Sequence, residues 1–187
     1  MSGVSAPLAS SLQFSLVLVG LPGSGKTTVG RQLARRLQLP FVDSDHAIEQ
    51  RLGCSIREFF DREGEAHFRD VEEETIDALT LMPGRVLSTG GGAVLRSANR
   101  QHLRERGRVI YLKSSPEELY RRLRHDVNRP LLQVADPLAR LRDLYAQRDP
   151  LYRETAHFVM ETGRPSVATL VNMIVMQLEL AGAIPQK

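Results

Sequence analysis

The chain has 187 residues, of which 42% are hydrophobic, and it carries a formal net charge of +3 at pH 7. This length and apolar content predict a single domain that buries about 70% of its unfolded surface. Because the charge is small and the basic residues are scattered among 22 acidic ones, with no basic tail, we expect no nucleic-acid partner.

Cysteine content and hydropathy exclude further classes of protein. Cys54 is the only cysteine, which excludes a disulfide within the chain, and no set of Cys and His residues has zinc-ligand spacing. No apolar run reaches the roughly 18 residues that span a bilayer, so we expect a cytoplasmic protein with no membrane partner. We expect residues 1–13 to form a disordered extension, residues 14–182 one domain and residues 183–187 a tail.

Short apolar runs predict buried strands, and helical patterns lie between them. The runs are Ser15 to Val19, Phe41 to Val42, Arg85 to Ser88, Val109 to Leu112 and Phe158 to Met160. This alternation predicts an α/β fold in which helices cover a parallel sheet.

The first predicted strand leads directly into Gly20 to Thr27 (GLPGSGKT), which fits the phosphate-binding pattern GxxxxGK followed by Ser or Thr. Backbone N–H groups of such a loop turn inward on an anion, and the next helix offers its positive end. Lys26 would reach the outer phosphates and Thr27 would hold Mg²⁺ directly. An accidental glycine-rich turn is the alternative, and we favour nucleoside triphosphate binding by Gly23, Ser24, Gly25, Lys26, Thr27 and Thr28.

Helix signals follow in chain order. The helix after the loop has Val29, Leu33 and Leu37 at fourfold spacing, which indicates a core-facing side. Ser55 with Glu58, and Ser115 with Glu118, are typical of capping boxes at helix starts. The last helix has a comparable apolar side, formed by Val171, Ile174, Val175 and Leu178.

The second predicted strand ends in Asp43-Ser44-Asp45. Ligands of open α/β sheets bind outside the carboxyl ends of the strands, and alternate residues of an extended segment point the same way. Asp43 could then face the water shell of Mg²⁺ while Asp45 faces a substrate hydroxyl. The alternative is that Asp45 only caps a helix from His46 to Leu52. With the phosphate loop upstream, we favour the chemical role.

The third predicted strand runs into Thr89-Gly90-Gly91-Gly92. Three glycines allow the backbone to pass close beside a ligand and leave its N–H donors unhindered. A triple glycine can equally be a structural turn, but at the carboxyl end of a strand in this fold we expect it on the floor of the site.

The chain resembles shikimate kinase from Leu16 to about Leu180, through GLPGSGKT, FVDSD, FRDVEE, STGGGAV, NRPLL and RDPLY in that order. The resemblance implies a fold like that of nucleoside monophosphate kinases, with a five-stranded parallel sheet in three α/β/α layers and a mobile lid at about 126–137. It implies that ATP, with Mg²⁺, phosphorylates the 3-hydroxyl of shikimate, a step in aromatic amino acid biosynthesis. We expect a monomer.

The resemblance also implies roles for single residues. Arg69 and Arg148 match positions that grip the substrate carboxylate, with Glu72 able to orient Arg69, and Gly91, flanked by Gly90 and Gly92, matches a backbone contact to substrate. For Arg69 the alternative is an ordinary ion pair on a helix surface. Arg129 matches the lid arginine that closes on the phosphates, and Arg122 and Arg164 match positions flanking the adenine. The expected catalytic residues are Lys26, Asp45 and Arg129.

Other functions stay open at this point. A related kinase, such as one for gluconate, shares the phosphate loop but need not pair two arginines on a carboxylate. A non-catalytic domain that senses a small effector has no need for Lys26, Thr27, Asp43 and Asp45 together. An ATPase that binds nucleic acid is favoured only by the sequence pI of about 9.3. The sequence also leaves open whether Asp45 acts as a base or only aligns the hydroxyl.

Overall fold

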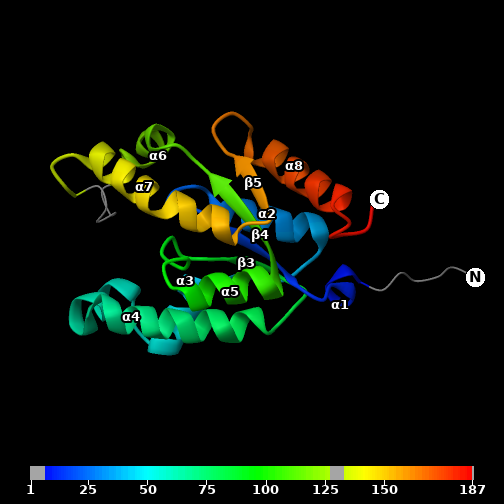
Figure 1. The fold of residues 1–187 in the computed structure, drawn as a ribbon, viewed down its shortest axis with the longest axis horizontal. Coiled ribbons are helices and arrows are strands. Elements are labelled where there is room, and N and C mark those ends of the chain that lie inside the picture. Colours follow the sequence, from blue (N-terminus) through cyan, green and yellow to red (C-terminus); the bar gives the residue numbers. More distant parts are fainter. Residues whose placement is uncertain (1–6, 127–132, 187) are drawn as a thin grey trace, which may run out of the picture.

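A computed structural model describes residues 7–126 and 133–186 of the chain. In this part of the chain, five parallel strands form one sheet in the order β2-β3-β1-β4-β5 (Figure 1). The strands are β1 (Ser15–Val19), β2 (Phe41–Asp43), β3 (Val86–Ser88), β4 (Gly107–Lys113) and β5 (Phe158–Glu161). Every predicted strand is confirmed. The fourth begins two residues earlier than expected because Gly107 and Arg108 still pair with β1.

Helices precede, connect and follow the strands. They are α1 (Leu8–Ser11), α2 (Lys26–Leu37), α3 (Ser44–Leu52), α4 (Ile56–Thr80), α5 (Ser97–Arg106), α6 (Pro116–Leu123), α7 (Pro137–Thr155) and α8 (Val167–Leu180). Both predicted capping boxes are confirmed, at Ser55 and at Ser115. Within the described residues, none of these helices combines the length and the apolar character needed to cross a membrane.

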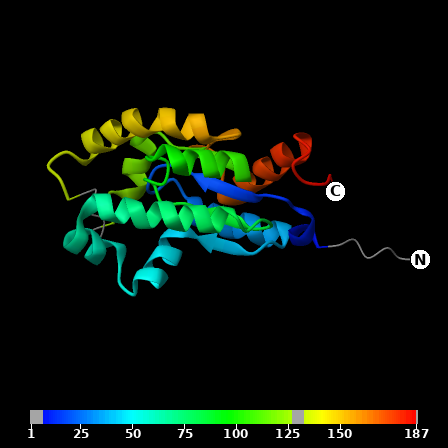
Figure 2. The same ribbon diagram turned by 60° about the horizontal axis from the view of Figure 1, so that its bottom comes forward.

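The two faces of the sheet have separate cores, and the central strand β1 contributes to both. Leu16 and Leu18 pack with the apolar sides of α2 and α8, while Val17 and Val19 pack with residues of α4, α5, α6 and α7. Figures 1 and 2 show α5 lying between α4 and α7 on this second face. The predicted three-layer α/β/α fold is therefore confirmed, and so are the two core-facing helix sides, whose residues are buried.

Strand register brings the candidate loops to one edge. Ser88, the last residue of β3, pairs with Leu18 of β1 on one side and with Asp43 of β2 on the other. The phosphate loop that follows β1, the carboxylate that ends β2 and the glycines that follow β3 therefore leave the sheet side by side.

The ends of the chain differ from expectation where they are described. Leu12 and Ile184 are 6% and 5% exposed and belong to the core beside α2 and α8, and α1 packs on the same core. Residues 7–13 and 183–184 therefore extend the domain, because their apolar side chains cover the edge of that core. The rest of the expected extension, residues 1–6, lies outside the described residues, and so does 127–132 of the expected lid.

Candidate active site

The phosphate loop joins the end of β1 to the start of α2. Gly25 precedes the helix with φ of 92°, a left-handed conformation that favours glycine. Lys26 opens α2 and is 8% exposed; its Nζ donates to the carbonyl oxygens of Gly20 and Leu21 at 2.7 and 3.0 Å. The ammonium group is therefore held inside the curve of the loop, beside the N–H groups that begin the helix.

Asp43 links the phosphate loop to the start of α3. The hydroxyl of Thr27 donates to Oδ2 of Asp43 at 3.1 Å, and the backbone N–H groups of Asp45 and His46 donate to Oδ1 at 2.9 and 3.2 Å. Asp43 is thus the N-cap of this helix. The alternative that Asp45 is the cap is wrong, because the chain already turns into the helix at Ser44.

The start of α3 at Ser44 also shows that one expectation is wrong, namely that strand alternation points Asp43 and Asp45 the same way. Asp45 lies in the first helical turn rather than on an extended segment, so strand alternation does not orient it. Both carboxylates nevertheless line the same cavity, since Asp43 ends the strand and Asp45 projects from the adjoining turn.

The glycine run lets two charged side chains reach the backbone after β3. A Cβ atom on Gly90 would lie 2.5 Å from Oδ1 of Asp45, and one on Gly92 would collide with the guanidinium group of Arg69. The N–H group of Gly90 also donates to the hydroxyl of Ser44 at 3.2 Å. A carboxylate and a guanidinium are thereby fixed against positions two residues apart on one loop.

Burial changes the acidity of Asp45. Its pKa is raised to about 6, mainly by removal from water and also by the nearby carboxylates of Asp43 and Glu72, while Lys26 opposes the shift. At neutral pH the side chain is mostly ionised, with a basicity suited to accepting a proton or a strong hydrogen bond.

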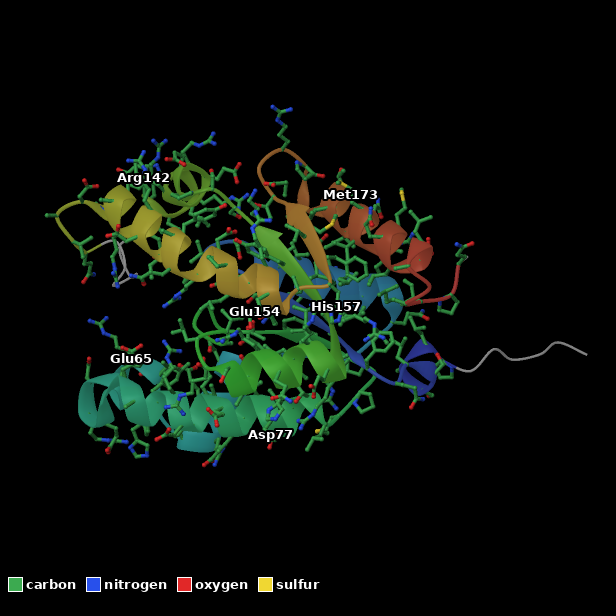
Figure 3. The ribbon with its side chains drawn as sticks, viewed as in Figure 1. Glu65, Asp77, Arg142, Glu154, His157 and Met173 are labelled. Carbon is green, nitrogen blue, oxygen red and sulfur yellow. The ribbon has the colours of Figure 1, made fainter. Side chains whose placement is uncertain are left out.

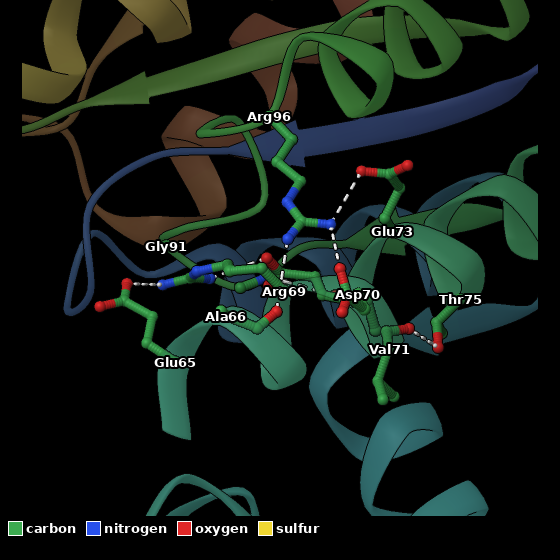
Figure 4. A network of polar contacts seen from close by, with 12 residues as sticks. Glu65, Ala66, Arg69, Asp70, Val71, Glu73, Thr75, Gly91 and Arg96 are labelled. Atoms are coloured by element: carbon green, nitrogen blue, oxygen red, sulfur yellow. Dashed lines mark hydrogen bonds and ion pairs between the residues drawn. The ribbon is translucent and has the colours of Figure 1, made fainter. Parts of the chain in front are cut away.

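Arg69 forms a partly buried network on α4. Its Nη1 donates to Oε1 of Glu72 at 2.7 Å and its Nη2 to Oε1 of Glu65 at 3.3 Å (Figure 4). The side chains of Arg69 and Glu72 are only 13% and 2% exposed, so the alternative of an ordinary surface pair is wrong. Burial raises the pKa of Glu72, against the lowering effects of Arg69 and of Arg148, which reaches the pair from α7. Arg69 of α4 and Arg148 of α7 therefore both act on Glu72, and their joint binding of a carboxylate stays a prediction.

A second arginine braces the same helix. Arg96, directly after the glycine-rich loop, donates to Asp70 at 2.7 Å, to Glu73 at 3.2 Å and to the carbonyl oxygen of Ala66 at 3.3 Å (Figure 4). These contacts hold α4 against the loop that Arg69 touches.

A cavity of about 480 Å³ lies between the loops at the carboxyl edge of the sheet. It is lined by Pro22, Gly23, Gly25, Lys26, Thr27, Thr28, Asp43, Asp45, Thr89, Gly91 and Leu123. Most of the predicted phosphate-loop residues therefore share one cavity with the predicted carboxylates and the middle glycine. Ser24 is buried and does not line the cavity.

The arginines that were predicted to flank the adenine, Arg122 and Arg164, do not line the cavity. Arg122 is exposed on α6, where its guanidinium donates to the carbonyl oxygen of Thr162 at 3.0 Å and lies 3.4 Å from that of Gly23. Arg164 is exposed in the loop between β5 and α8 and does not line the cavity. Arg129 lies outside the described residues.

Two kinds of site residue were not singled out from the sequence. Thr89 and Leu123 line the cavity, and Tyr152 donates its hydroxyl to the carbonyl oxygen of Gly91 at 2.5 Å. Tyr152 belongs to the quoted stretch RDPLY, which was the available signal. Its contact with a residue 61 positions away follows only from packing.

The donor set at the loop fits magnesium. The Thr27 hydroxyl and the Asp43 carboxylate are hard oxygen ligands already within hydrogen-bond distance of each other. Among the described residues no group of three or more His, Cys, Asp or Glu side chains could hold a metal. Mg²⁺ suits this arrangement because it commonly binds through one or two protein oxygens, substrate phosphates and water.

The chain is similar to known kinases over most of its length. The family model for shikimate kinase matches residues 22–179. A shikimate kinase of Paracidovorax citrulli (strain AAC00-1) is 65% identical over 176 residues, covering 92% of this chain and 96% of the relative. The structure of a shikimate kinase from Acinetobacter baumannii in complex with shikimate has a TM-score of 0.85 and 44% identity, covering 93% of this chain and 98% of that one.

A gluconokinase from Sinorhizobium meliloti 1021 is a more distant match, with a TM-score of 0.55 and 18% identity over 91% of this chain and 94% of that one. At that identity the likeness concerns the fold alone. By the family model and the close relatives, the chain belongs to the shikimate kinase family.

Proposed function

We propose that this protein transfers the terminal phosphoryl group of ATP to the 3-hydroxyl of shikimate, giving shikimate 3-phosphate and ADP in aromatic amino acid biosynthesis. The observation that carries the assignment is the short glycine run, which has Asp45 against Gly90 and Arg69 against Gly92. A hydroxyl acceptor and a carboxylate-binding cation thus stand together next to a phosphate loop, which suits a small hydroxy acid.

On the nucleotide side, the loop supplies the binding groups. N–H groups of Gly23, Ser24 and Gly25, just before the start of α2, are suited to phosphate oxygens, as is the Lys26 ammonium group. Thr28 lines the same cavity. From the family resemblance we assign the remaining contacts to Arg122, Arg129 and Arg164.

On the acid side, the two arginines from α4 and α7 would bind the carboxylate. Arg69 is oriented for this by Glu72, which holds one of its terminal nitrogens. Arg148 approaches from the other helix, and Gly91 lines the cavity together with the phosphate loop. Two cationic groups on one carboxylate fix the direction of the ring as well as its affinity.

Magnesium would be held by Thr27 directly and by Asp43 through water, and when bound it neutralises charge on the phosphate oxygens. Phosphoryl transfer needs positioning and charge stabilisation more than covalent help. Lys26 would stabilise charge on the transferred group, while Asp45 would accept the hydrogen bond of the attacking hydroxyl. With its pKa near 6, Asp45 is largely ionised at neutral pH and available for this contact.

We further propose that residues 14–182 form the catalytic domain together with the packed segments at its ends, that a lid lies at about 126–137, and that the protein acts as a cytoplasmic monomer. Light scattering of the purified protein tests the last point through its mass, which is 20.9 kDa for one chain.

A coupled assay of ADP release with ATP and Mg²⁺ tests the proposed function. Shikimate should support turnover, with a product heavier by one phosphoryl group, while gluconate and a nucleoside monophosphate should not. Lys26→Ala serves as the inactive control. Turnover with gluconate alone would assign the chain to another substrate, and binding of shikimate without ADP release would indicate a sensor.

A further inference from the structure

Tyr152 contacts the predicted acid-binding part of the site through Gly91 but does not line the cavity. It is fully buried at 0% exposure, and its ring packs on that of Tyr111 with the centroids 5.0 Å apart. It lies on α7, four residues after Arg148, and therefore on the same side of the helix one turn further on. Packing within the core therefore fixes the position of the Tyr152 side chain.

The hydroxyl of Tyr152 fixes the middle of the glycine-rich loop. Gly90 and Gly92 have their carbonyl oxygens bonded within the loop, to the N–H groups of Ala93 and Leu95 at 3.1 Å each. Gly91 instead directs its carbonyl oxygen to the Tyr152 hydroxyl, at 2.5 Å. The peptide plane at Gly91 is therefore oriented by a side chain from α7.

The same hydroxyl lies next to the second carboxylate-binding arginine. Burial raises the pKa of Tyr152, and the neighbouring guanidinium of Arg148 is the main influence that lowers it, with Arg69 acting in the same direction and Glu72 against it. One phenol oxygen thus stands between the loop touched by Arg69 and the helix that carries Arg148.

We propose that Tyr152 is a positioning residue for binding of the substrate carboxylate, because its hydroxyl ties the Gly91 peptide to the helix that carries Arg148. This hydrogen bond sets the distance between the Gly91 backbone and the Arg148 guanidinium, which would both bind the same small acid. This inference rests on the proposed function. It adds a residue that touches neither ATP nor the reacting atoms, so its loss acts on the acid and spares the nucleotide.

Tyr152→Phe tests the proposal, since it keeps the ring and removes only the hydroxyl. A neutral hydrogen bond corresponds to about a 3- to 10-fold change in an equilibrium, so KM for shikimate should rise by about that factor. The KM for ATP and kcat should stay within about twofold of wild type. An unchanged KM for shikimate, or equal rises in both KM values, would overturn the proposal.

Thr155→Val is the matched control for a merely structural effect. Thr155 is also fully buried on α7, and its hydroxyl donates to the carbonyl oxygen of Leu151 at 2.7 Å, away from the cavity. Both variants lose one buried hydroxyl, so both should lower the melting temperature. Only Tyr152→Phe should change KM for shikimate, and a similar rise in Thr155→Val would reduce Tyr152 to a packing residue.

A double variant that combines Tyr152→Phe with Arg148→Ala separates positioning from packing, even if Tyr152→Phe lowers the melting temperature. All assays are run well below the lowest melting temperature of the variants. If the hydroxyl acts by linking Gly91 to Arg148, the double variant should show a smaller rise in KM than the product of the two single effects. A fully multiplicative rise would exclude the link. Wild-type turnover of shikimate in the same assay shows that such a failure concerns Tyr152 and not the proposed function.

Discussion

Arg69 and Glu72 form an ion pair with an Nη1 to Oε1 distance of 2.7 Å, in which the glutamate side chain is 2% exposed. The pair has both a stabilising and a functional role, and these can be separated. A buried charge without its partner costs about 3 to 5 kcal/mol, whereas a well-packed apolar pair can be nearly neutral.

Arg69→Met should therefore lower the free energy of unfolding by roughly 3 to 5 kcal/mol, less whatever Glu72 recovers by taking up a proton. The double change Arg69→Met with Glu72→Met should restore most of that loss. Neither variant should bind shikimate well, because a charge-assisted bond is worth about 1.5 to 3 kcal/mol, or roughly 10- to 100-fold in KM. Urea unfolding and steady-state kinetics measure the two effects. Recovery of KM in the double variant would contradict the assignment.

Glu65 should compete with the substrate for Arg69. It lies on α4 (Figure 3), its carboxylate is 3.3 Å from Nη2 of Arg69, and its side chain is 61% exposed. Exposed pairs are worth about 0.2 to 1 kcal/mol, so Glu65→Gln should lower KM for shikimate by up to about fivefold. Glu63→Gln, which removes a carboxylate near Arg62 and His67, is the matched control. A raised KM in Glu65→Gln would instead mean that Glu65 helps to orient Arg69.

The acid limb of the pH profile should follow Asp45. Because the carboxylate has a pKa of about 6 and accepts the substrate hydroxyl only when ionised, kcat/KM should fall below about pH 6. Measurement at limiting ATP and shikimate reports the protein before substrates add charge to the site. A profile flat down to pH 5 would show that the charge of Asp45 is not required.

The Asp45 carboxylate should also lower the free energy of unfolding at neutral pH. The folded protein raises the pKa of Asp45 from 3.8 to about 6, so the penalty for the ionised form is absent below about pH 4 and complete above about pH 6. Asp45→Asn should then raise the free energy of unfolding at pH 7.5 by at most about 3 kcal/mol and leave it nearly unchanged at pH 4. Denaturant unfolding at both pH values checks this sign, and an equal effect at both would contradict it.

Magnesium dependence should depend on the hydroxyl of Thr27. Thr27→Val keeps the shape of the side chain but loses the oxygen that contacts Asp43 at 3.1 Å. We expect the Mg²⁺ concentration at half-maximal rate to rise by about tenfold or more, the equivalent of about 1.4 kcal/mol or more. Thr27→Ser should remain close to wild type because it keeps the oxygen. Activity of the wild type after chelation of Mg²⁺ would contradict the proposed metal requirement.

The sequence determined the features that depend on local order. Apolar runs of strand length gave the positions of the buried strands, the capping boxes marked the starts of α4 and α6, and the glycine-rich pattern placed Lys26 at the start of a helix. These features need only neighbouring residues, because backbone geometry and side-chain period are set within a few positions.

Tertiary structure decided what meets across long separations. The sequence could not tell that Asp43 caps α3 and so turns Asp45 into a helical position, since either carboxylate satisfies the capping pattern. It also did not predict that the guanidinium group of Arg69 packs closely against Gly92, or that the Tyr152 hydroxyl bonds to Gly91, 61 residues away. Such contacts arise when buried polar groups must find partners within a packed core, and the folded arrangement alone selects which partner is near.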